Sequence, residues 1–175
     1  MPDLFLFLCK IYKMDISFRE YTDNDKKLLT ELVMKLMDFV ILTDPIKRIR
    51  RMPGYDEVRI KRLLNKINKN KGKIFFVQNN KKVIGVAACF IVKQSKENLL
   101  EVVPTKLGQL EELYLEEEYR GKGIGRLMLE HVQKYLKSRG CDTLWLTVFA
   151  HNKNARDFYI QEGFIEREIG MLKQL

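Results

Sequence analysis

The sequence is poor in the residues that bind metals or form disulfides. Its 175 residues include three cysteines and two histidines. Cys9, Cys89 and Cys141 are far apart and show no Cys-x-x-Cys spacing, which is typical of reduced packing residues rather than of a disulfide framework. His131 and His151 have no partner at ligand spacing. The sequence therefore predicts no metal site.

Long apolar runs are also absent. The most apolar stretch, residues 4–9, is too short to span a bilayer, and Asp3 stands where a signal peptide would carry positive charge. We therefore expect no membrane segment and a cytoplasmic location. The length fits one domain with a substantial core. Because Met14 opens a strand-like segment, we expect a single domain over residues 14–175. Residues 1–13 would be an N-terminal extension that lies outside the fold or covers a surface groove.

Charge is abundant but unevenly distributed over a chain of net charge +9. Basic residues dominate between residues 44 and 82, whereas glutamates dominate between residues 97 and 118. An RNA-binding domain is expected to interleave aromatic side chains with its basic residues, and residues 47–73 contain only Tyr55. The pattern favours a solvated basic helix face, with a nucleic-acid-associated protein as the alternative.

Hydrophobic periodicity predicts an alternation of helices and strands. The expected strands are residues 16–18, 74–77, 83–92, 109–115 and 143–149, followed by one more at the C-terminus. The expected helices start at Asp23 or Asp25, at residue 56, at residue 124 and at residue 152. Residues 79–81 predict a hairpin turn, and the strand at 143–149 is expected to be buried. His131 falls in an apolar helical stripe, which favours a packed core histidine over a catalyst.

Residues 110–128 contain an apolar strand, a glycine-rich basic turn and the start of a helix. The turn holds three basic residues and three glycines: Arg120, Lys122, Arg126, Gly121, Gly123 and Gly125. The glycines allow successive backbone N–H groups to converge at the positive end of the helix dipole, and the added charge suits a pyrophosphate. The spacing fits neither a dinucleotide fingerprint, which needs glycine at position 126 or 128, nor a Walker loop.

The turn Arg120-Gly-Lys-Gly-Ile-Gly125 resembles the Arg/Gln-x-x-Gly-x-Gly/Ala turn of the GNAT superfamily of N-acetyltransferases. Downstream, Asn152-x-x-Ala155-x-x-x-Tyr159-x-x-x-Gly163-Phe164 has the spacing that this family uses on its last helix and the following turn. The resemblance covers about residues 14–170 as architecture. It implies an α/β fold with a mixed, mostly antiparallel sheet, a splayed central strand pair and helices on both faces.

The resemblance also implies that the acetyl group of acetyl-CoA is transferred directly to a primary amine of a small molecule, polyamine or peptide. In this family the strand before the turn pairs with the pantetheine arm, and the corresponding residues are Leu113, Tyr114 and Leu115. The residues that would bind the pyrophosphate are Arg120, Gly121, Lys122, Gly123, Ile124, Gly125 and Arg126. Asn152 would contact the cofactor arm and also cap the helix that follows.

Catalytic roles follow from the same resemblance. Tyr159 matches the position that protonates the CoA sulfur, and a phenol is mostly protonated at neutral pH; the alternative is an aromatic packed on the inner helix face. Some family members carry the base at the position of Thr147, where threonine cannot replace it. Others carry it two residues before the pantetheine-pairing stretch, at Glu111. Strand alternation predicts that Glu111 and Glu112 lie on opposite faces, so we choose Glu111 and keep Glu112 as the alternative.

Several questions stay open at the level of sequence. A non-catalytic acyl-CoA-binding sensor on the same fold would need neither Tyr159 nor Glu111. The two glutamates could instead be an acidic strand end exposed to solvent. The acids near the expected thioester favour a cationic amine, whereas the basic helix of residues 59–69 would steer an acidic or phosphorylated amine. The acceptor and the oligomeric state, a homodimer included, are left open.

Overall fold

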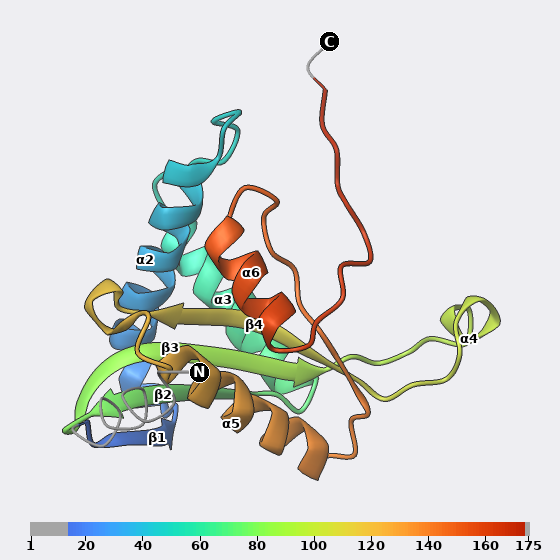
Figure 1. Ribbon diagram of the computed structural model, residues 1–175, viewed down its shortest axis with the longest axis horizontal. Coiled ribbons are helices and arrows are strands. Elements are labelled where there is room, and N and C mark those ends of the chain that lie inside the picture. Colours follow the sequence, from blue (N-terminus) through green and yellow to red (C-terminus); the bar gives the residue numbers. More distant parts are fainter. Residues whose placement is uncertain (1–13, 174–175) are drawn as a thin grey trace, which may run out of the picture.

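The computed structural model describes residues 14–173, and the expected extension, residues 1–13, lies outside them. Five strands form one sheet in chain order. They are β1 (Ile16–Glu20), β2 (Lys73–Asn79), β3 (Lys82–Ile91), β4 (Leu107–Leu115) and β5 (Thr143–Trp145). β1 to β4 are antiparallel neighbours, and β5 joins β4 in parallel (Figure 1). The predicted mixed, mostly antiparallel sheet is confirmed.

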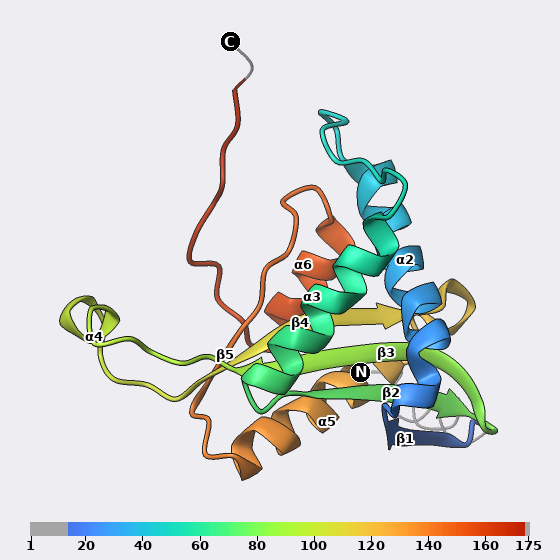
Figure 2. The same ribbon diagram turned by 180° about the vertical axis from the view of Figure 1, so that it is seen from behind.

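Helices cover both faces of this sheet. α2 (Lys26–Thr43) and α3 (Tyr55–Lys69) lie on one face, and α5 (Ile124–Ser138) lies on the other (Figure 1 and Figure 2). α6 (Lys153–Gln161) packs on the same side as α5. The remaining short helices are η1 (Asp23–Asp25), α4 (Asn98–Glu101) and η2 (Glu117–Tyr119). Among the described residues, no helix has both the length and the apolar character needed to cross a membrane.

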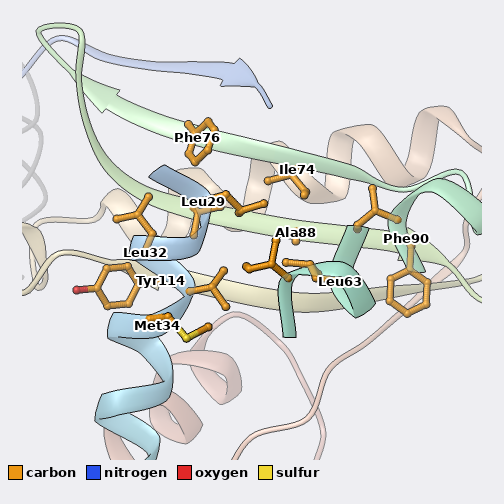
Figure 3. Packing of buried hydrophobic residues seen from close by; sticks show 13 residues of the cluster. Leu29, Leu32, Met34, Leu63, Ile74, Phe76, Ala88, Phe90 and Tyr114 are labelled. Carbon is orange, nitrogen blue, oxygen red and sulfur yellow. The ribbon is translucent and has the colours of Figure 1, made fainter. Parts of the chain in front are cut away.

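The first hydrophobic core fills the space between the sheet and the helix pair α2 and α3 (Figure 3). Apolar residues three or four positions apart on α2 and α3 point inward, because that spacing places them on one helix face. The buried members are Leu29, Leu32, Val33, Met34, Ile60, Leu63, Ile67, Ile74, Phe76, Val86, Ala88, Phe90 and Tyr114. Each large apolar side chain buried here stabilises the fold by about 1.5–3 kcal/mol. This core fixes α3 over the middle of the sheet.

The second core lies between the sheet and α5. Its α5 members are Ile124, Met128, Leu129, Val132 and Leu136, and they pack against apolar residues of β2, β3 and β4. His131 belongs to this layer, because its ring stacks on Phe18 at 4.3 Å and meets Phe75 edge-on at 4.6 Å. Burial lowers the pKa of His131, which keeps the ring neutral. The prediction of a packed core histidine is confirmed.

Most predicted elements form, including the hairpin turn, where Asn80 and Lys81 both adopt positive φ. Two strand predictions are wrong. The strand expected at 143–149 ends at Trp145, and none of its three residues is buried. The strand expected at the C-terminus is not formed in residues 165–173. A strand needs a neighbouring strand to satisfy its backbone N–H and C=O groups. Because β5 pairs with β4 over only three residues, β5 is too short to offer an edge on which a further C-terminal strand could pair.

Candidate functional site

The central strand pair is splayed. β4 and β5 pair only over Leu107–Gln109 and Thr143–Trp145, and beyond that point they diverge (Figure 2). The N–H of Glu116 donates to the carbonyl of Ile84 on β3 at 2.9 Å. Because backbone groups alternate between the two edges of a strand, Leu113 directs its N–H and C=O away from β3, into the splay. An extended amide chain has the hydrogen-bonding groups needed to pair with this edge.

The glycine turn lies beyond the end of β4 and leads directly into α5. Gly121 and Gly123 adopt φ values of 69° and 77°, a backbone region that favours glycine. Within the described chain, the backbone N–H groups of residues 121–126 donate to no carbonyl or side chain. These donors lie at the positive end of a fifteen-residue helix, where an anion is stabilised. The turn therefore has the geometry of a phosphate site.

The basic side chains of the turn are already engaged with the protein. Nε of Arg120 donates to the carbonyl of Leu115 at 2.9 Å, and its guanidinium stacks over the ring of Tyr114. Lys122 donates to the carbonyl of Glu118 at 2.6 Å. Arg126 forms an ion pair with Glu162 at 2.8 Å. Backbone N–H groups, rather than free charges, are therefore the main anion donors of the turn.

Tyr159 faces inward from α6. Its ring packs 5.1 Å from that of Phe158 and 5.5 Å from that of Phe164. Burial raises the pKa of Tyr159 to about 12, so the phenol stays protonated at neutral pH. No group of the described residues accepts a hydrogen bond from its hydroxyl. At the start of α6, the side chain of Asn152 accepts from the N–H of Ala155 at 3.2 Å, which confirms the predicted helix cap.

The expectation that Glu111 and Glu112 face opposite sides of the sheet is wrong. A β-bulge causes the difference, because the pairing with β3 shifts between Ala88 and Cys89 and leaves Glu111 without a partner. The bulge interrupts strand alternation, so Leu110 packs toward α5 while both carboxylates meet side chains of α3. The two acids therefore belong to one site.

Two cations of α3 hold these carboxylates. Arg59 forms an ion pair with Glu112 and also lies 3.9 Å from Glu111. Lys66 lies 2.6 Å from Oε1 of Glu111, and the amide of Gln109 donates to Oε2 at 3.0 Å. The side chains of Glu111 and Glu112 are only 9% and 3% exposed. The alternative of an acidic strand end exposed to solvent is therefore wrong.

Burial raises the pKa of Glu112 to about 7, although the nearby Arg59 pulls that pKa down. A carboxyl group with such a pKa exchanges its proton near neutral pH. Glu112 is thus held in a dry position beside Glu111, whose carboxylate lies nearer the surface. The pair combines a buried titratable group with a more accessible one.

Sequence reasoning missed the partners of these acids. Arg59 and Lys66 lie seven residues apart, two helical turns, and therefore project from one face of α3. That spacing was the only sequence signal for a shared partner. A run of basic residues on a helix more often indicates a solvated face than an ion pair with a strand far away in the sequence. The interpretation as a solvated face is wrong for Arg59, whose side chain is 21% exposed and lies against both glutamates. Lys66 is 49% exposed, so it lies on a solvated face and also pairs with Glu111.

A cavity of about 730 Å³ opens at the end of α2 and the start of α3. Its polar lining includes Asp38, Arg51, Asp56 and Glu57, and neither Glu111 nor Tyr159 takes part. It is a separate hollow from the two-glutamate cluster, although Glu57 and Arg59 are close on the same helix. Within residues 14–173, no cluster of three or more potential metal ligands is present.

The sequence matches a known protein family. The family model described as the acetyltransferase (GNAT) family matches residues 36–164. That stretch contains β4, the glycine turn and α6. The chain therefore belongs to the GNAT acetyltransferase family.

Individual relatives match shorter stretches. An uncharacterized N-acetyltransferase of Methanocaldococcus jannaschii is 30% identical over 96 residues, which are 54% of this chain and 40% of that protein. The thialysine N-epsilon-acetyltransferase of Bos taurus is 42% identical over 50 residues, 29% of each protein. The chain thus spans less than half the length of these curated relatives. An aminoglycoside N-acetyltransferase solved with CoA has the same fold, with a TM-score of 0.66 and 14% identity over 93% of this chain and 95% of that one.

Proposed function

We propose that this protein is an enzyme that transfers the acetyl group of acetyl-CoA directly to a primary amine. The observation that carries the proposal is the combination, in one domain, of an open strand edge, a turn of unpartnered N–H groups and an inward-facing phenol. Membership of the family and the CoA-bound structure with the same fold support the choice of cofactor. The donor set fits that cofactor, because it offers backbone pairing to an amide arm and N–H groups to a pyrophosphate.

The strand edge, the glycine turn and Asn152 would each contact a different part of the cofactor. The edge formed by Leu113, Tyr114 and Leu115 would hold the pantetheine arm, with Leu113 supplying the outward backbone groups. The pyrophosphate would rest on the N–H groups of residues 121–126. Asn152 already uses one side-chain oxygen for its helix cap, and its amide nitrogen remains to donate to the arm.

We assign Glu111 as the general base, acting directly or through a water molecule. An amine is mostly protonated near neutral pH, and a carboxylate beside it can attract the ammonium and then accept its proton. Glu111 is the more exposed of the two acids, and Lys66 already shows that an ammonium group fits against its Oε1. Glu112, which is buried on Arg59, is the alternative base.

Tyr159 would be the general acid. Its raised pKa keeps the proton available, and its hydroxyl is uncommitted within the described residues. The sulfur that leaves during acetyl transfer would accept this proton. A role of this kind contributes about a hundredfold or more to turnover.

For the acceptor, we infer a primary amine on a small molecule, polyamine or peptide. The similarity to a thialysine N-epsilon-acetyltransferase supports a flexible primary amine as the acceptor. Arg59 and Lys66 offset the charge of Glu111 and Glu112, so net attraction of a cation must come from the more exposed acids along the chain, such as Glu117 and Glu118.

The proposal is tested by screening amines for acetyl-CoA-dependent release of free thiol, together with calorimetric binding of acetyl-CoA. We expect binding and at least one acetylated amine. Binding without transfer to any amine would favour the non-catalytic acyl-CoA sensor. Failure to bind acetyl-CoA would overturn the assignment of the turn.

A further inference from the structure

One amine of the protein already contacts the proposed base. Nζ of Lys66 lies 2.6 Å from Oε1 of Glu111, within hydrogen-bond distance. Lys61 and Lys69 lie on the same helix and make no ion pair within the described residues. The side chain of Lys66 is 49% exposed, so it is held at one end and has room to move. Among the lysines of α3, only Lys66 shares a hydrogen bond with a candidate catalytic group.

Lys66 reaches the gap between β4 and β5 from the face of the sheet that α3 covers. The glycine turn leads into α5 on one face of the sheet, whereas α3 lies on the opposite face (Figure 2). Under the proposed function, a cofactor anchored at the turn would enter the gap between β4 and β5 from the α5 side, which leaves the α3 side to the attacking amine (Figure 2). Lys66 approaches Glu111 from α3, and therefore from that side.

We propose that the enzyme acetylates its own Lys66. This inference rests on the proposed function, since it uses the same cofactor, base and acid. The ammonium of Lys66 gives one proton to Glu111, and the nitrogen forms a bond to the acetyl carbonyl carbon as the carbon–sulfur bond breaks. The departing sulfur takes a proton from Tyr159, and the second proton leaving the nitrogen is returned to the phenol through solvent. The products are N-acetylated Lys66 and free CoA.

The modification would change the site that performs it. Acetylation removes the charge of Lys66, so the ion pair with Glu111 is lost. Glu111 then has Arg59 at 3.9 Å and the amide of Gln109 as its remaining partners, and an external ammonium no longer competes with Lys66. Self-acetylation is therefore a step that opens the base to other acceptors.

The test is incubation of the full chain with acetyl-CoA and no added amine, followed by peptide mass spectrometry over time. We expect Lys66 to be acetylated about a hundredfold faster than Lys61 or Lys69, because only Lys66 has a general base beside it. The rate constant should not depend on protein concentration, as befits a reaction within one molecule. Equal rates at all three lysines, or a rate that rises with protein concentration, would overturn the inference.

Two variants separate a catalysed reaction from chemical acetylation. Glu111→Gln should slow modification of Lys66 to the rate of Lys69 and leave Lys69 unchanged. Tyr159→Phe should slow Lys66 in the same way and guards against a folding defect in the first variant. Unaltered Lys66 modification in both variants contradicts the inference.

Lys66→Arg tells this inference apart from the proposed function. If the variant and the wild type both acetylate added amines while Lys66 of the wild type stays unmodified, self-acetylation is wrong and the acetyltransferase assignment stands. If calorimetry detects no acetyl-CoA binding and no amine is acetylated, self-acetylation and the acetyltransferase assignment are both wrong. Lys69→Arg is the matched control, and it should leave both reactions unchanged.

Discussion

Arg59 on α3 forms an ion pair with Glu112, a residue of β4 that is only 3% exposed. The helix and the strand are far apart in sequence, so this contact fixes α3 across the splayed edge of the sheet. The same guanidinium lies 3.9 Å from Glu111, and the bulge in β4 is what brings both acids within its reach. A basic helix and an acidic strand thus build one site.

The buried position of Glu112 makes stability depend on pH. Burial raises its pKa from 4.5 to about 7 in the folded state. Between these values the folded protein keeps a proton that the unfolded chain has lost, so the free energy of unfolding should fall as pH rises through the window. Below pH 4.5 the stabilising contribution of Glu112 protonation is fully present. Urea unfolding on either side of the window measures this change.

Glu112→Gln should flatten this dependence, because glutamine does not titrate and can still accept a hydrogen bond from Arg59. The difference between wild type and variant should reach a few kcal/mol across the window. Glu117→Gln, at an exposed position, is the matched control and should follow the wild type. A wild-type slope retained in Glu112→Gln would show that another group controls the transition.

Glu111→Gln should reduce kcat/KM for a cationic amine by about a hundredfold, because the group that accepts the proton is lost. In the wild type, kcat/KM should rise with pH toward the amine pKa and fall with added salt. Glu112→Gln should have the smaller effect if Glu111 is the base. A larger loss in Glu112→Gln would exchange their roles, and a preference for anionic amines would refute the acceptor class.

Much of this site could be predicted from the sequence, and the failures have identifiable causes. The glycine turn and the Asn152 cap are local features, set by φ values and side-chain reach within a few residues. The bulge at Glu111 depends on a register between two strands that local alternation does not encode. Arg59 and Lys66 gain their partners only when α3 is laid across the sheet, which is a tertiary event.

The strand predicted at 143–149 failed for a related reason. Its sequence is rich in β-forming residues, but β4 turns away after Gln109 and leaves Leu146 and the residues after it without a paired neighbour. Strand propensity measures how well a side chain fits a pleated sheet. A segment with high strand propensity therefore does not form a strand where no neighbouring strand is present. The same splay that limits β5 creates the open edge at Leu113.

Tyr159→Phe should lower kcat by about a hundredfold while leaving acetyl-CoA affinity nearly unchanged. The phenylalanine ring can keep the packing on Phe158 and Phe164, and no hydrogen bond within the described residues is lost. Steady-state kinetics at saturating acetyl-CoA, paired with calorimetry, measures both. Tyr135→Phe is the control, because it removes a hydroxyl bonded to the carbonyl of Lys71 instead. Wild-type turnover in Tyr159→Phe would return this residue to a packing role.

Gly123→Val should weaken acetyl-CoA binding, because a β-branched residue does not adopt a φ of 77° without strain and its side chain crowds the N–H groups of the turn. Gly54→Val is a matched control: Gly54 has a φ of 82° at the start of α3, away from the turn. Both variants should lose stability, and only Gly123→Val should lose affinity in calorimetry. Equal affinity in the two variants would remove the pyrophosphate from this turn.

The last prediction concerns where the domain begins. A chain that starts at Met14 should fold and keep acetyl transfer, because β1 begins at Ile16 and pairs with β2 along its whole length. The side chain of Met14 itself packs against the second core, and its carbonyl accepts from the N–H of Ile16 at 3.1 Å. A chain that starts at Arg19 is the control, since it loses Ile16 and Phe18 from the core and most of β1. Soluble yield, the free energy of unfolding and turnover should match the full chain for the first truncation and drop for the second. If both truncations fail alike, residues 1–13 are needed to complete the fold, and a domain of residues 14–175 is wrong.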